Sequence, residues 1–319
     1  MRFRAGIAFT AIALLSLATP ARAVDKVNVG TGLWPVWAFL PLQIGIDEGI
    51  WPKYGIEPTV VNNGSGARLI QAMTAGSVDF GLSSGVDMAF AAKGAPIRAV
   101  AAFAGEPRTV SIIVIAGSPV KEPADLKGKT IVIPGVGSVA EWLVRQMAIA
   151  EGWGMDGVKI VSAGSLSGEI AVIKSHEADA AVGPPEVGFA LEEKGEGRVA
   201  FGLERYARHF VADVVYARTD LIQNKPDLVQ RFLNGFFASI RFVKTHKDET
   251  SAIAVRELQS TPAIMARIWD ELSPWLDDQG TFDSQGVEAL KQSYVDLRML
   301  EQKPRDDQIL TSRFVPVKP

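Results

Sequence analysis

Short runs rich in Val and Ile alternate along the chain with amphipathic stretches, and this alternation limits the possible fold more than any other feature. The first cycle predicts a strand at 26–30, a loop at 31–37 and a helix over 38–48 that Gly49 ends. The same cycle predicts later strands at 56–61, 78–82, 97–103, 130–133, 158–162 and 178–182. Because strands that alternate with helices form parallel sheets covered by those helices, we predict an α/β fold.

The length of the chain and the recurrence of the cycle predict two lobes. The 319 residues suffice for two units. Ala72–Phe80 and Val172–Ala180 share a helix end, a turn, an aspartate and a strand, although two strand–helix–strand units can look alike by chance. Apolar strands at 110–115 and 210–217 would cross between the lobes and form the hinge. We therefore assign residues 24–108 to lobe 1, 109–212 to lobe 2, and 213–319 to the return strand and C-terminal helices of lobe 1.

The first 23 residues have the pattern of an export signal. Arg2 and Arg4 give a positive start, an almost wholly apolar run covers 5–18, and Ala21–Ala23 is a small-residue cleavage pattern. A membrane anchor is the alternative, but the apolar run is shorter than the roughly 20 residues that span a bilayer. We expect a mature protein that begins near Val24 and is located in the periplasm.

Cysteine is absent, and the charge is close to balanced. The lack of cysteine excludes disulfides, thiolate metal sites, a cysteine nucleophile and a lipid-modified cysteine. The chain carries 33 Lys+Arg against 36 Asp+Glu, a net charge of -3, and its basic residues are scattered along the sequence. Nucleic-acid binding is therefore not expected.

Four segments in order resemble a known family. They are Ile46–Ile56, Ala75–Gly81, Asp125–Ile131 and Glu177–Ala181. Together they resemble the nitrate-, sulfonate- and taurine-binding proteins of ABC importers and their thiamine-precursor-binding relatives. The resemblance implies a type II periplasmic-binding-protein fold with a small-molecule ligand between the lobes. It also implies a monomer whose partner is a permease with a cytoplasmic ATPase, and which meets the membrane only through that permease.

Ligands of open α/β sheets bind beyond the carboxyl ends of the strands, and this rule selects the same loops in both lobes. The loops are Gly32–Trp37, Asn62–Gly66, Ser83–Gly85, Gly135–Ser138 and Gly183–Glu186. Helix N-termini leave backbone N–H groups unpaired and carry partial positive charge, so loops of this kind favour anionic oxygens. Candidate contacts in them are Ser65, Ser83, Ser84, Gly137, Ser138 and Pro185. Alternatively, the serines cap their own helices.

Two tryptophans and one arginine are further candidates. Trp34 and Trp37 lie in the first loop, where they could form an aromatic wall over the ligand, or else pack against a neighbouring helix. Arg108 precedes the first crossing strand and could supply a fixed cation for a sulfonate, nitrate or carboxylate, or else lie in solvent.

Two carboxylates argue against a purely anionic ligand. Glu186 begins a predicted helix, and Asp213 lies amid apolar residues of the return strand. A buried carboxylate needs a partner, which could be a ligand ammonium or another residue of the protein. An ammonium would favour a zwitterion such as an amino-sulfonate.

Catalysis is not expected. Some members of the resembling family are enzymes that make a thiamine pyrimidine, and the resemblance to them implies a cleft histidine, a cofactor lysine and a cysteine-rich motif. Here cysteine is absent, and His176, His209 and His246 fall outside the nominated loops. No Ser-His-Asp or metal-ligand spacing is present, so we expect neither cofactor nor metal. We predict a periplasmic receptor that captures a small anionic or zwitterionic organic solute by hinge closure, with a ligand-sensing module as the alternative.

Overall fold

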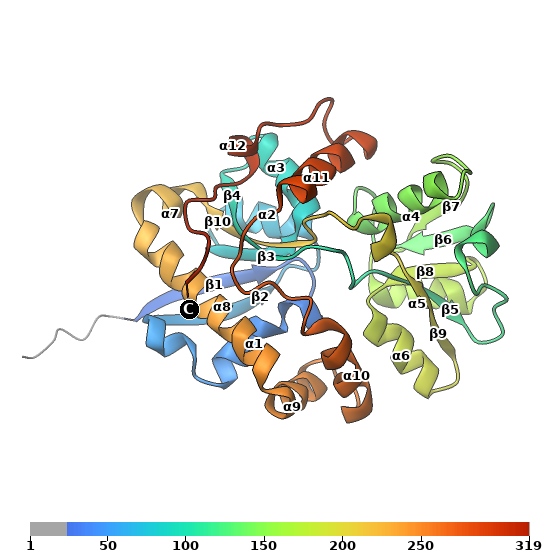
Figure 1. The fold of residues 1–319 in the computed structure, drawn as a ribbon, viewed down its shortest axis with the longest axis horizontal. Helices are drawn as coiled ribbons and strands as arrows, with labels where there is room; N and C mark the ends of the chain where they lie inside the picture. Colours follow the sequence, from blue (N-terminus) through green and yellow to red (C-terminus); the bar gives the residue numbers. More distant parts are fainter. Residues whose placement is uncertain (1–23, 319) are drawn as a thin grey trace, which may run out of the picture.

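Two five-stranded mixed sheets form the frame of the molecule, and the computed structural model describes residues 24–318. The first sheet has the order β2 (Ile56–Asn62), β1 (Asp25–Thr31), β3 (Phe80–Ser84), β10 (Asp213–Arg218) and β4 (Ile97–Ala104). The second has the order β7 (Lys159–Ser162), β6 (Thr130–Ile133), β8 (Ala180–Gly183), β5 (Ser111–Ile115) and β9 (Gly197–Gly202). Each sheet with its helices is one lobe, and Figure 1 shows the two side by side, lobe 2 in greens.

The two sheets repeat one design. In lobe 1, β1 pairs in parallel with β2 and β3, while β10 runs antiparallel between β3 and β4. In lobe 2, β6 pairs in parallel with β7 and β8, while β5 runs antiparallel between β8 and β9. In each lobe, therefore, the antiparallel strand comes from the segment that arrives from the other lobe.

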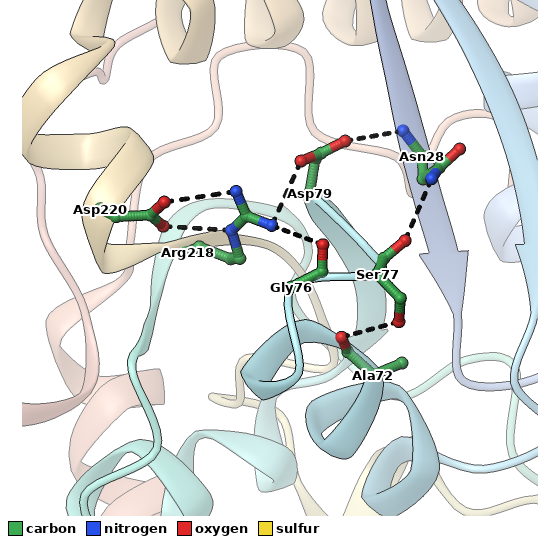
Figure 2. Close-up of polar contacts among 7 residues, drawn as sticks. All are labelled: Asn28, Ala72, Gly76, Ser77, Asp79, Arg218 and Asp220. Atoms are coloured by element: carbon green, nitrogen blue, oxygen red, sulfur yellow. Dashed lines mark hydrogen bonds and ion pairs between the residues drawn. The ribbon is translucent and has the colours of Figure 1, made fainter.

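The predicted internal repeat has matching contacts in the two lobes. The Asp79 carboxylate accepts the Asn28 N–H at 2.9 Å, and the Asp179 carboxylate accepts the Thr130 N–H at 2.9 Å. Ser65 and Ser165 cap the corresponding helices in nearly the same backbone conformation. In lobe 1 the turn before β3 is held further by Arg218, which bonds Gly76 O at 2.9 Å and pairs with Asp79 and Asp220 (Figure 2).

Helices cover both sheets. Those of lobe 1 are α1 (Leu40–Asp47), α2 (Gly66–Thr74), α3 (Met88–Ala92), α7 (Thr219–Asn224), α8 (Pro226–Thr245), α9 (Lys247–Glu257), α10 (Pro262–Leu272), α11 (Ser284–Asp296) and α12 (Asp306–Ile309). Those of lobe 2 are α4 (Val139–Ala150), α5 (Leu166–Lys174) and α6 (Pro185–Glu193). Short 3-10 turns lie at Trp37–Phe39, Trp51–Tyr54, Gly85–Asp87, Pro123–Leu126 and Glu204–Tyr206. The C-terminal third is helical, as expected from Pro226 onward.

The core of lobe 1 is built on aromatic side chains of α8. Phe232 stacks on Phe80 of β3 with ring centroids 3.9 Å apart, and Phe236 packs edge-on against Phe103 of β4 at 5.2 Å. All four side chains are fully buried. Burial of such side chains stabilises the fold by about 1.5–3 kcal/mol each, so α8 is firmly fixed to the sheet.

The chain passes between the lobes twice. Residues 105–110 join β4 to β5 and residues 203–212 join β9 to β10, so each crossing is an irregular segment flanked by strands rather than a strand itself. The two crossings are bonded together: Leu203 N–H donates to Val110 O at 3.0 Å, and Ala212 N–H to Ala104 O at 3.0 Å. The α/β class with two lobes and two crossings is confirmed, while our division at residues 108 and 212 stays a prediction.

Some expectations concern residues that the structure does not describe. The export signal and its cleavage after Ala23 fall on residues 1–23, outside the described part. Within residues 24–318, no helix is both long enough and apolar enough to cross a membrane.

Candidate solute-binding cleft

A cavity of about 470 Å³ lies between the two lobes. Lobe 1 lines it with Pro35 and Val36 from the loop after β1 and with residues 257–260 between α9 and α10, and lobe 2 lines it with α6, including Glu186, and with Lys194 just after that helix. The Trp37 N–H of lobe 1 donates to Glu186 Oε1 of lobe 2 at 3.4 Å. The strand-end loops nominated from the sequence therefore meet across the lobe boundary at this contact.

Asp87 is the first carboxylate of the lobe 1 edge. It lies in the turn Gly85–Asp87 directly after β3, is half-buried, and accepts a hydrogen bond from Ser83 Oγ at 2.6 Å. A Cβ atom added at Gly66, the first residue of α2, would overlap this carboxylate. The N-terminus of α2 therefore already packs against an acid of the protein. Burial raises the pKa of Asp87 to about 6, against the opposing effect of the Ser83 hydrogen bond.

Asp213 is the second carboxylate of this edge. It begins β10, where it pairs with Ser84 at the carboxyl end of β3, and it is only 8% exposed. Its side chain makes no hydrogen bond or ion pair with the residues described, 24–318. Burial first, and then the nearby charge of Asp87, raise the pKa of Asp213 to about 7.

Lobe 2 contributes two more buried acids. Glu186 is the second residue of α6 after Pro185, is 8% exposed, and has no partner for Oε2 among the described residues. Glu169 lies in the first turn of α5 with 0% exposure, and neither of its oxygens has a partner in the described chain. Burial raises the pKa of both groups, that of Glu169 to about 9. Both carboxyls are therefore held in surroundings that disfavour their charge.

The Gly137 loop has its own acid as well. Gly137 adopts φ +77, and its N–H donates to Glu141 Oε2 at 2.8 Å. Arg145 neutralises Glu141 from the other side through two bonds to Oε1, at 2.8 and 3.0 Å. The backbone N–H of this loop is thus already bonded.

The four nominated serines all form hydrogen bonds with other groups of the protein. Ser65 accepts the Arg68 N–H at 3.3 Å and caps α2, Ser138 accepts the Glu141 N–H at 3.3 Å and caps α4, and Ser84 accepts the Val86 N–H at 3.3 Å. Ser83 donates to Asp87. Three serines thus act as helix caps, which was the alternative to ligand contact, and the fourth holds a carboxylate.

The tryptophans and the arginine occupy different surroundings. Trp37 is 1% exposed and belongs to the core, although its indole Nε1 has no partner among the described residues. Trp34 is partly buried and packs against the core, and its carbonyl accepts the Asn62 Nδ2 at 3.3 Å. Arg108 is half-exposed and pairs at 3.0 Å with Glu106 in the first crossing. In this conformation neither Trp37 nor Arg108 presents its side chain as a wall or a cation of the cavity.

Sequence reasoning missed three acids of this region, namely Asp87, Glu141 and Glu169. Asp87 and Glu141 each lie just after a nominated strand-end loop, whereas Glu169 lies in the first turn of α5, after a loop that was not nominated. Acidic residues are common there because they complement the helix dipole, so their identity carries no signal by itself. The internal repeat could have revealed Glu169. It occupies the position in lobe 2 that corresponds to the apolar Leu69 in lobe 1, so an acid stands where the repeat has a core residue.

Two mixed five-stranded sheets covered by helices and joined by two crossings make up the periplasmic-binding-protein fold. Residues 38–250 match the family described as NMT1/THI5 like. This match covers more than half of the chain, which therefore belongs to that family.

Two relatives match by sequence. A protein of Brucella abortus (strain 2308), named as a candidate binding protein, is 27% identical over 230 residues, which cover 70% of each chain. The formylaminopyrimidine-binding protein of Halalkalibacterium halodurans is 28% identical over 178 residues, which cover 56% of this chain and 53% of that protein.

Solved structures match over most of the chain. The alkanesulfonate-binding protein SsuA of Xanthomonas axonopodis bound to MOPS has a TM-score of 0.74 at 18% identity, covering 91% of this chain and 97% of that one. A ligand-binding component of an ABC-type import system from Staphylococcus aureus has a TM-score of 0.75 at 15% identity, with the same coverage. The desulfurization enzyme DSZB has a TM-score of 0.65 at 16% identity, again with that coverage. At these identities the likeness shows the periplasmic-binding-protein fold and nothing finer.

Proposed function

We propose that this chain is the solute-binding receptor of an ABC importer and captures a small organic solute between its lobes. The observation that carries the proposal is the cavity of about 470 Å³ between the lobes, lined from lobe 1 by Pro35, Val36 and residues 257–260 and from lobe 2 mainly by α6. Both named relatives are described as binding proteins, and one of the structures of the same fold as a component of an ABC-type import system. A periplasmic location, a permease partner and a monomeric state belong to this proposal.

The mechanism is hinge closure. Each lobe offers half of the site, and the solute bridges the two halves, so it binds the closed form more tightly than the open one. A solute can shift the equilibrium by no more than this difference in affinity. The segments that would bend are the paired crossings at 105–110 and 203–212, because within residues 24–318 the chain passes from one sheet to the other at these two places. The permease would then recognise the closed arrangement.

Among the solutes expected, the zwitterionic type agrees best with the cleft. A nitrate or a simple sulfonate in the cavity would meet the buried Glu186 carboxyl, and the cation in the lining, Lys194, is exposed to solvent. A zwitterion such as an amino-sulfonate brings its own cation to Glu186, and its anionic end could pair with Lys194.

Binding rather than catalysis is the proposed activity, although one structure with this fold is an enzyme. The three histidines support this choice, since none is part of the cleft loops. His176 lies in the turn after α5, His209 is exposed and pairs with Asp283 at 3.3 Å, and His246 follows α8.

A thermal-shift screen of the refolded mature protein, residues 24–319, tests the proposal. Taurine, alkyl and aryl sulfonates, nitrate, aromatic carboxylates and aminopyrimidines would be tested singly. A solute at about 100 times its dissociation constant should stabilise the fold by roughly 2.7 kcal/mol, a rise of several degrees in Tm. Val187→Trp, which fills the cavity, should abolish the shift, whereas Ile149→Trp on the exposed face of α4 should keep it. The proposal is wrong if no solute shifts the Tm and mass spectrometry finds no small molecule in the protein as purified.

A further inference from the structure

We propose that the side-chain amide of Gln259, in the turn between α9 and α10, binds the solute in the cavity between the lobes. This inference rests on the receptor function proposed above and adds a contact from the C-terminal helices, outside the loops at the ends of the strands. It is carried by the backbone conformation of Gln259, by its place in the cavity wall and by the way in which its turn is held.

Gln259 keeps a long side chain at a helix end where glycine is usual. It is the second residue after α9 and has φ +50, and the next N–H, that of Ser260, donates to Val255 O at 3.1 Å, which closes a Schellman motif. Left-handed backbone strains a residue that has a Cβ atom, so Gln259 costs free energy that glycine would not. Five other helices end on glycine at the same position, with φ from +62 to +99: Gly49, Gly76, Gly94, Gly152 and Gly195.

Three helices end instead on a residue with a side chain, and two of these side chains line cavities between the lobes. Gln259 lines the cavity of about 470 Å³, and Arg298, with φ +55 after α11, lines a second cavity of about 250 Å³ together with residues of α4 in lobe 2. His176, with φ +62 after α5, is exposed and lines neither of these two cavities. A side chain retained on strained backbone at a cavity wall indicates a function for that side chain.

Gln259 is also the polar side chain that lobe 1 leaves available in the cavity. The polar residues with which lobe 1 lines this cavity are Glu257, Gln259 and Ser260. Glu257 pairs with Arg256 at 3.0 Å, and the Ser260 hydroxyl is enclosed by the protein. The Gln259 side chain is exposed and forms no hydrogen bond with any residue in the range 24–318. Its amide can therefore both donate a hydrogen bond to the solute and accept one from it.

Contacts with α6 of lobe 2 fix the turn beside the cavity. Thr261, which caps α10, donates to Glu193 at 2.7 Å, and Arg267 pairs with Glu192 at 3.2 Å. The same helix lines the cavity with Val187. A solute that bonds to Gln259 while it packs against α6 therefore bridges the two lobes, as hinge closure requires.

Gln259→Gly separates a binding role from a structural one. Glycine relaxes the left-handed backbone, so the Tm should rise by about 1–3 °C, while loss of the amide should weaken solute binding by about 3- to 10-fold. Isothermal titration measures the affinity for taurine, benzenesulfonate, benzoate and 4-amino-2-methylpyrimidine. His176→Gly is the matched control, because it relaxes the same conformation away from the cavity, and it should raise the Tm and leave the affinity unchanged.

A single thiol tests whether position 259 faces the cavity, and this test does not depend on the identity of the solute. The chain has no cysteine, so Gln259→Cys and His176→Cys each carry one reactive group. Val187→Trp, which fills the cavity, should slow the reaction of Gln259→Cys with N-ethylmaleimide several-fold and leave that of His176→Cys unchanged. Any of the four solutes that binds should protect Gln259→Cys in the same way.

The outcomes separate this inference from the receptor function. If Gln259→Gly binds as tightly as wild type a solute that Val187→Trp no longer binds, Gln259 is not a solute contact while the receptor stands. Equal reactivity of Gln259→Cys with and without Val187→Trp would likewise refute the inference alone. If none of the four solutes binds to wild type and the purified protein carries no small molecule, both are refuted.

Discussion

Four acids with raised pKa values, Asp87, Glu169, Glu186 and Asp213, distinguish the two lobes at the scale of single residues. Asp87, Glu186 and Asp213 lie within three residues of the end of a strand. Glu169 lies in the first turn of α5, the helix that precedes β8. Each has a raised pKa, chiefly because burial disfavours its charge. Groups of this kind destabilise the empty protein when they ionise, so they favour a ligand that shares or neutralises their charge.

Asp213 gives a prediction about stability and pH. Its pKa is about 7 in the folded protein, against 3.8 ordinarily, so between these values the native state holds a proton that the unfolded state has lost. The free energy of unfolding should therefore fall as pH rises from about 4 to 7. Asp213→Asn removes this loss and should make the protein roughly 1–3 kcal/mol more stable than wild type at pH 8, with little difference at pH 4.

Urea unfolding of both proteins from pH 4 to 8 measures the effect. Asp87, Tyr216 and Tyr294 are common to both proteins, so the difference between the two profiles reports Asp213 together with its electrostatic coupling to Asp87. Asp220→Asn, at an exposed surface ion pair, is the control. Profiles that stay parallel at every pH would show that Asp213 is not held in an apolar site.

Residues of the site were only partly predictable from the sequence. Asp213 and Glu186 could be picked out because one interrupts an apolar strand and the other follows a strand-end loop. Ser65, Ser84 and Ser138 could not be assigned between capping and binding, because a capping serine and a ligand-binding serine occupy the same position before a helix. Only the observed bonds decide that question.

Elements were predicted more reliably than residues, because periodicity reports them directly. The strand at 130–133 has the predicted bounds, and the helix from Pro226 ends within one residue of the expected position. The strand β9 (Gly197–Gly202) was not predicted. It is an edge strand whose residues are mostly half-buried, so it lacks the strongly apolar run of the central strands.

The aspartate turn before β3 predicts an effect on stability alone. Asp79 accepts the Asn28 N–H and pairs with Arg218 at 3.4 Å, which ties α2, β1 and β10 together at the edge opposite the cleft (Figure 2). Asp79→Ala should lower the free energy of unfolding by about 1–3 kcal/mol, because a backbone donor and a half-buried guanidinium lose their partner. Solute affinity should not change.

The repeat supplies a matched variant for this prediction. Asp179→Ala removes the corresponding bond to Thr130 in lobe 2 and should have a smaller effect, because its ion-pair partner Lys129 is more exposed than Arg218. Thermal melts and titrations of both variants measure the two quantities. A change in affinity for Asp79→Ala with unaltered stability would contradict a structural role for the turn.

At the scale of the whole molecule, the lobes touch on two sides of the cavity. On one side α4 meets α11, where the Trp142 indole and Gln146 amide both donate to Asp296, at 3.0 and 3.3 Å. On the other side α10 meets α6, where Arg267 lies 3.5 Å from the centre of the Phe189 ring and Thr261 bonds to Glu193 at 2.7 Å (Figure 1). Such contacts hold the two lobes together in this arrangement, which is the closed form if the hinge bends as proposed.

The α4–α11 contact predicts that the open form can be favoured from outside the cavity. Asp296→Ala removes two hydrogen bonds between the lobes, each with a net contribution of about 1 kcal/mol, so the ratio of open to closed protein should rise by roughly 10-fold or more. Small-angle scattering of the solute-free variant should give a larger radius of gyration than wild type. Because the closed form is the one that binds, the apparent affinity for solute should fall by the same factor by which the closed population falls. Asp220→Ala, which breaks an ion pair within lobe 1, should change neither quantity. An unchanged radius together with an unchanged affinity would mean that Asp296 does not bias the hinge.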